Sequence, residues 1–203
     1  MIICLIFFSN VMHADTLFSS GSISGVFGGP LIKYTKLNNE DALIVGARGG
    51  WAFNNMLTIG GGAYGVMNDV PINPAQPDTN FINLGYGGIV AEYVGMSDNM
   101  IHWQVNMLLG TGVVSTRNGN KTGKNDMIFI FEPGADGVLN ISSTIRVALG
   151  LSYRIVSGVD PDNFNDYIKN SDLSGFTASL TMLFGSFCKI ITKQKPTIFR
   201  GLF

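Results

Sequence analysis

Apolar and polar side chains alternate along much of the chain, and residues 144–156 show the alternation most clearly. The odd positions of this segment are all apolar, whereas the even positions hold small residues and two arginines, Arg146 and Arg154. Successive side chains of a β-strand point to opposite faces, so the segment predicts a strand with one apolar face and one arginine-bearing face. A soluble sheet and a membrane barrel both contain strands of this kind.

The same alternation recurs in segments of about 10 to 14 residues, separated by clusters of Asn, Asp, Pro and Ser. It predicts eight strands, at residues 25–37, 43–53, 57–66, 81–94, 101–117, 127–140, 144–156 and 175–184. No segment has the 3.6-residue period of an amphipathic helix, so we expect little helix. The 203 residues are most simply a single all-β domain.

The polar residues of these segments lie on the side opposite the apolar residues, and their charges are roughly balanced. The interior of a closed barrel demands such a balance, because an unpaired buried charge is costly. We therefore predict an eight-stranded antiparallel up-and-down transmembrane β-barrel, apolar outside and filled by polar side chains. The predicted luminal charge network comprises Arg48, Glu92, Gln104, Asn106, Glu132, Asp136, Arg146 and Arg154. Glycines on the same face, such as Gly150, leave room for these side chains.

The connections between the predicted strands differ in length at the two ends of the barrel. The long ones are 38–42, 67–80, 118–126 and 157–174, and the short ones are 54–56, 95–100 and 141–143. Outer-membrane barrels have this asymmetry, with long extracellular loops, and it places both termini in the periplasm. Five aromatic residues near the other end fit the girdle of a membrane interface: Trp51, Phe53, Tyr93, Trp103 and Phe184.

Composition removes several other classes of function. Charged residues make up only 13% of the chain, which leaves few charges for a water-exposed surface. No internal run reaches the roughly 18 apolar residues of a membrane-spanning helix. The net charge is −1 and no basic stripe is present, so we expect no nucleic acid among the partners.

The two ends of the chain have features of their own. Residues 1–14 resemble a secretory signal peptide, with the apolar run MIICLIFF and a cleavage position after Ala14. Without that leader Cys188 is the only cysteine, so no intrachain disulfide is expected. The barrel is expected to span residues 25–187, and residues 188–203 to form a basic C-terminal extension.

The sequence contains no recognisable motif for catalysis, for a cofactor or for a metal. A hydrolytic site would have to use His102, which has luminal parity and is better explained as a hydrogen-bonding residue. Residues 160–172 are rich in oxygen ligands, but Phe164 occupies a ligand position of an EF-hand alignment, which favours a solvated loop. We therefore expect no enzymatic activity.

Several segments rich in glycine and aromatic residues resemble a little-characterised family of small bacterial envelope proteins with an outer-membrane barrel. They are VFGGPLIKYTKLNNEDALIVGARGGW (26–51), TIGGGAYG (58–65), LGYGGIVAEY (84–93), FEPGADGVLNI (131–141) and VALGLSYRIVSG (147–158). More loosely, the chain is similar to eight-stranded barrels of the OmpA and OmpX type. The resemblance covers roughly residues 25–187 and implies the bacterial outer membrane as the location. GFTASLTMLF (175–184) also resembles the signal read by the barrel-assembly machinery, which would be a partner.

Three functions are compatible with these patterns. The first is an outer-membrane barrel in contact with outer-membrane lipid, with a charge-plugged lumen and a structural or surface-interaction role, whose long loops meet an unknown extracellular partner. The second is a soluble lipocalin-like carrier of an apolar ligand, and the third is a membrane-barrel lipid-modifying enzyme. The luminal ion pairs either plug the bore or exchange partners to open a narrow, porin-like path. The direction in which Arg146 and Arg154 point separates the first function from the second.

Overall fold

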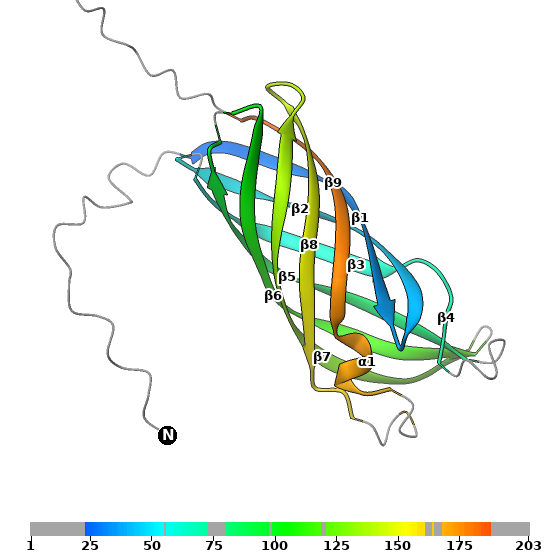
Figure 1. The fold of residues 1–203 in the computed structure, drawn as a ribbon. Coiled ribbons are helices and arrows are strands. Elements are labelled where there is room, and N and C mark those ends of the chain that lie inside the picture. Colours follow the sequence, from blue (N-terminus) through cyan, green and yellow to red (C-terminus); the bar gives the residue numbers. More distant parts are fainter. Residues whose placement is uncertain are drawn as a thin grey trace, which may run out of the picture.

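The structure is a computed structural model that describes residues 23–54, 56–72, 80–97, 99–118, 121–160, 164 and 168–187. These residues form a closed antiparallel barrel of eight strands (Figure 1). The barrel strands are β1 (Ile23–Leu37), β2 (Glu40–Phe53), β3 (Leu57–Val66), β5 (Phe81–Gly95), β6 (Ile101–Asn118), β7 (Lys121–Asn140), β8 (Ile145–Ser157) and β9 (Gly175–Gly185). The predicted leader 1–14 and extension 188–203 lie outside the described residues.

Each barrel strand pairs with its neighbours in the chain, and the barrel closes where β1 pairs with β9. A two-residue strand, β4 (Val70–Pro71), pairs with the start of β5, and β3 pairs directly with the rest of β5. The described part of the chain contains one short helix, α1 (Asn170–Leu173). The predicted fold class, an eight-stranded up-and-down barrel, is therefore confirmed.

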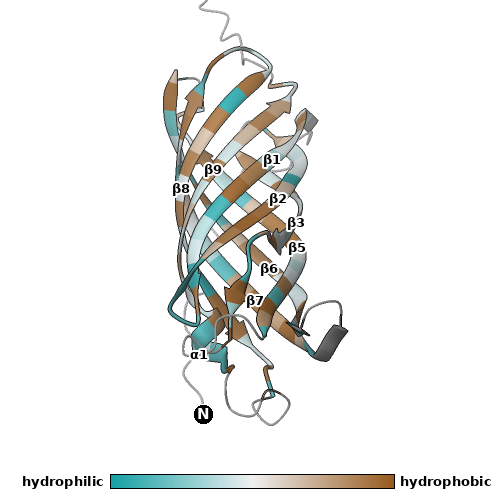
Figure 2. Ribbon diagram, turned by 90° about the vertical axis from the view of Figure 1, so that its right-hand side faces the viewer, coloured by the Kyte–Doolittle hydropathy of each residue, from teal (hydrophilic) through white to brown (hydrophobic). Residues whose placement is uncertain are grey.

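The alternation in β8 has a definite direction in the barrel. Leu149 and Leu151 are 66% and 69% exposed on the outside, whereas Arg154 has no exposed surface. Figure 2 shows hydrophobic residues along the barrel strands and hydrophilic ones at α1. With a rise of about 3.3 Å per residue and a tilt of about 40°, the outward positions from Ile145 to Ile155 cover a height of about 25 Å. That height matches the apolar band of transmembrane barrels.

Two connections that we expected to be long contain only two residues each. Only Asn38 and Asn39 join β1 to β2, both with positive φ angles (51° and 64°), and a two-residue connection likewise separates β6 from β7. Turns in which both central residues have positive φ match the twist of a hairpin, and asparagine tolerates them well. The prediction of loops at 38–42 and 118–126 was wrong, because the polar residues beside each turn continue the paired strands.

The two remaining long connections, residues 67–80 and 158–174, carry β4 and α1 and lie at the same end of the barrel (Figure 1). We call this the loop end; the opposite end, where the chain enters β1 and leaves β9, is the turn end. Both connections contribute buried apolar side chains to a cluster with inward residues of the strands. Those side chains are Val70, Ile72, Val159, Phe164, Ile168 and Leu173. The expectation of a solvated loop at 160–172 was therefore wrong for Phe164 and Ile168.

Candidate functional site

The first charged cluster in the bore joins four strands. Arg48 on β2 forms ion pairs with Asp136 on β7, at 2.8 Å between Nη2 and Oδ2, and with Glu92 on β5, at 3.3 Å between Nη1 and Oε1. Gln104 on β6 donates a hydrogen bond from Nε2 to Oδ2 of Asp136 at 2.7 Å. None of these four side chains is more than 8% exposed. The alternation of the sequence predicts all four on the luminal face.

A second cluster centres on Lys33 of β1, which the sequence analysis had not assigned to the network. Lys33 Nζ lies 2.7 Å from Glu132 Oε1 and 4.0 Å from the centre of the Tyr64 ring. Glu132 also accepts hydrogen bonds from Ser152 Oγ at 2.6 Å and from Tyr86 Oη at 3.0 Å. The charge of Glu132 is thus compensated by one cation and two hydroxyl donors, which is what a buried carboxylate requires.

Lys33 escaped prediction because β1 carries a lysine on each face. Lys33 is 6% exposed, whereas the side chain of Lys36 is 65% exposed and lies near Asp41 on the outside. Leu37 could have identified Lys33 as an inward residue. Leu37 ends β1, is buried and lies on the same face of the strand as Lys33. An apolar residue at a turn, flanked by polar ones, identifies the inward face of such a strand.

Three other residues of the predicted network lie apart from these ion pairs. Arg154 is fully buried and donates from Nε to the backbone oxygen of Leu173 at 2.8 Å. Asn106 lines a cavity between the two clusters. Arg146, at the turn end of β8, is half-buried, and its guanidinium carbon lies 3.7 Å from the centre of the Phe187 ring. Among the described residues, no ion pair includes either arginine.

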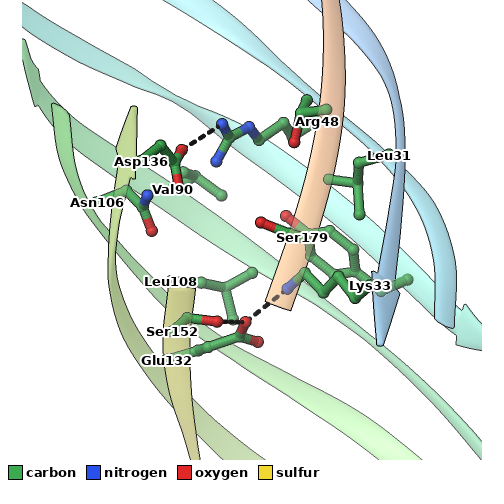
Figure 3. Close-up of a pocket in the computed structure, with 12 residues that line it drawn as sticks. Leu31, Lys33, Arg48, Val90, Asn106, Leu108, Glu132, Asp136, Ser152 and Ser179 are labelled. Carbon is green, nitrogen blue, oxygen red and sulfur yellow. Dashed lines mark hydrogen bonds and ion pairs between the residues drawn. The ribbon is translucent and has the colours of Figure 1, made fainter. Parts of the chain in front are cut away.

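The cavity between the clusters has a volume of about 20 Å³, enough for about one water molecule. Figure 3 shows Arg48 and Asp136 on one side of it and Lys33 and Glu132 on the other. Gly150 pairs with Asp136 in the β7–β8 register, and a Cβ atom at Gly150 would clash with the carboxylate of Asp136. The missing side chain at Gly150 therefore makes space for the first cluster.

His102 is buried at the turn end of the bore. Its Nδ1 lies 3.4 Å from Nδ2 of Asn140, which also donates to the backbone oxygen of Asn99 at 2.7 Å. The described residues give His102 no hydroxyl or carboxylate partner. A hydrolytic triad needs both a nucleophile and an orienting acid, and this arrangement supplies neither.

The described residues contain no group of three or more His, Cys, Asp or Glu side chains placed to hold a metal ion. None of their helices has the length and apolar character that crossing a membrane requires.

No protein-family model matches the chain, and no curated protein matches its sequence. Among solved structures it is similar to Neisserial surface protein A (NspA), with a TM-score of 0.55 and 12% identity over 80% of this chain and 96% of that one. Ail, the attachment invasion locus protein of Yersinia pestis, has a TM-score of 0.45 and 11% identity over 79% of this chain and 97% of that one. The NspA match confirms the resemblance to small outer-membrane barrels at the level of the fold.

Proposed function

We propose that this chain is a bacterial outer-membrane protein whose barrel spans the lipid and whose loop end acts as an interaction surface outside the cell. The observation that carries this proposal is the inverted arrangement of side chains in the barrel. Leu149 and Leu151 point outward, while Arg48 and Arg154 are buried in the bore. Lipid satisfies an apolar exterior of this kind, and water does not.

The contacts within the loop end support a role as an interaction surface. Apolar side chains of the two long connections, such as Val70 and Ile168, pack into the bore and anchor the described residues beside them against a fixed core. Asn38 adds two links: its backbone N–H donates to the oxygen of Asp172 at 2.7 Å and its Nδ2 to the oxygen of Ile72 at 2.6 Å. A surface held in one conformation loses less entropy on binding a partner. The partner is proposed to be extracellular, and the termini periplasmic.

The charged clusters are proposed to plug the bore rather than conduct. Three buried cations face three buried carboxylates: Lys33, Arg48 and Arg154 against Glu92, Glu132 and Asp136. The space between them has room for about one water molecule, and an apolar layer closes the loop end. A polar cavity of this size also disfavours a carrier of apolar ligands. The surroundings of His102 disfavour hydrolysis, so we propose no enzymatic activity.

The orientation can be tested by labelling single cysteines in intact cells with a membrane-impermeant maleimide, in a background in which Cys4 and Cys188 are both replaced by Ser. Ser171→Cys places an exposed thiol at the loop end, and Ser143→Cys is the matched exposed serine at the turn end. We expect the thiol at 171 to react in intact cells and the thiol at 143 to react only after the outer membrane is permeabilised. The reverse pattern would refute the proposed orientation, and recovery of the protein in the soluble fraction would refute the membrane location.

A further inference from the structure

We propose that Arg146 is the centre of a binding site for an oxyanion of the phosphate class, at the turn end of the bore. Its guanidinium carbon lies 3.7 Å from the centre of the Phe187 ring, and Phe187 in turn stacks on Phe27 with 6.0 Å between ring centres. Stacking on an aromatic face fixes the plane of the guanidinium group. Its edge, which carries the N–H donors, then remains available for two parallel hydrogen bonds to an oxyanion.

The charge of Arg146 has no counter-ion within the part of the chain that the structure describes. The buried carboxylates are already paired elsewhere: Glu92 and Asp136 with Arg48, and Glu132 with Lys33. Arg146 itself is half-buried. A cation in that position loses part of its hydration without gaining a counter-ion, and an anion taken from the surroundings would compensate its charge.

Two unpartnered polar atoms lie on the same inner wall. Asn140 stands opposite Arg146 in the β7–β8 register, and its Nδ2 lies 3.4 Å from Nδ1 of His102. Nε2 of His102 and Oδ1 of Asn140 are both buried and have no hydrogen-bond partner among the described residues. The tautomer of His102 decides whether Nε2 donates or accepts a hydrogen bond. A hydrogen phosphate group suits either tautomer, because its oxygens accept from Arg146 and its hydroxyl can donate to Oδ1 of Asn140.

The phosphate could belong to a lipid headgroup or to a soluble molecule. Ile145, next to Arg146, pairs with Phe184 of the aromatic residues at the turn end. Aromatic girdles lie at the depth of the lipid headgroups. A lipid headgroup and a soluble phosphate can therefore both reach Arg146. The inference concerns the turn end and is independent of the proposed role of the loop end.

Phosphate binding can be measured on the refolded full chain in an uncharged detergent. We expect the ³¹P resonance of inorganic phosphate to shift and broaden saturably with protein, at an ionic strength held constant with sodium chloride. Arg146→Gln should weaken binding about tenfold or more, the effect of losing hydrogen bonds to a charged group. Arg146→Lys keeps the charge but loses the planar fork, so it should bind several-fold more weakly than the native protein. Phe187→Leu should fall between the native protein and Arg146→Gln.

Arg117→Gln is the matched control, because Arg117 lies at the loop end and is paired with Asp69. Binding that is equal in the native protein and in Arg146→Gln, or lowered equally by Arg117→Gln, would refute the site. Each variant must first show the compact, heat-sensitive gel mobility of the native barrel. In nanodiscs without phosphate, a change in the Arg146 Nε resonance with phosphatidylglycerol but not with phosphatidylcholine identifies a lipid headgroup. A response to added phosphate alone identifies a soluble ligand, and no response to either refutes the proposal.

Discussion

At the scale of single residues, each buried charge depends on its partner. Lys33 and Glu132 are 2.7 Å apart and nearly inaccessible, so replacing Lys33 by Met leaves an uncompensated carboxylate in the bore. We expect Lys33→Met to lower the free energy of unfolding by about 3–5 kcal/mol, measured by urea titration in phospholipid vesicles. Lys36→Met is the control, since Lys36 and Asp41 form an exposed pair worth about 0–1 kcal/mol. Equal effects of the two substitutions would contradict the pairing of Lys33.

Which luminal residues the sequence could reveal depends on how clearly each strand separates its two faces. Asp136 and Arg154 were placed in the bore because their strands have one wholly apolar face. In β1 a lysine on each face removed that contrast, so Lys33 was missed. The sequence also could not separate Arg146 from the ion pairs, because parity assigns a side chain to a face but not to a level along the bore. Its separation depends on the position of Phe187, which follows the last strand.

At the scale of the elements, the turn between β1 and β2 connects the loop end to the barrel wall. Asn38 and Asn39 both have positive φ, but only Asn38 also donates to the backbone of Ile72. We expect Asn38→Ala to lower the free energy of unfolding by about 2–3 kcal/mol, the sum of a strained backbone and a lost hydrogen bond. Asn39→Ala should cost about 1–2 kcal/mol, which is the backbone cost alone. If chemical unfolding shows the same loss of unfolding free energy for both variants, the hydrogen bond to Ile72 does not stabilise the barrel.

The lengths of the elements were harder to predict than their number. The alternation of apolar and polar residues predicted all eight barrel strands, because one face of each strand lines the bore and the other faces outward. Near the loop end the strands extend beyond the apolar band. Outward and inward positions are both polar there, so the sequence no longer alternates between apolar and polar residues. Residues 121–126 and 40–42 therefore resembled loops although they are paired strands. Conversely, Phe164 and Ile168 are apolar residues in a polar segment, and that contrast is the signal of their inward packing.

At the scale of the whole molecule, the apolar exterior makes an energetic prediction that separates a membrane barrel from a soluble one. Leu151 is 69% exposed and lies near the middle of the apolar band of β8. A lysine there would have to lose its hydration within the hydrocarbon. We expect Leu151→Lys to lower the free energy of unfolding in phospholipid vesicles by about 2–4 kcal/mol, the cost found for a basic residue at the midplane. The measurement is reversible urea unfolding followed by the fluorescence of Trp51 and Trp103.

Position along the barrel axis provides the control for this prediction. Ser143 is also exposed but lies in a connection at the turn end, where water is present. Ser143→Lys should change the free energy of unfolding by no more than about 1 kcal/mol, the value expected near the interface. In a water-soluble barrel both lysines would be solvated, and both substitutions would be nearly neutral or slightly stabilising. A difference of at least about 2 kcal/mol between the two variants therefore requires that lipid covers Leu151 and not Ser143.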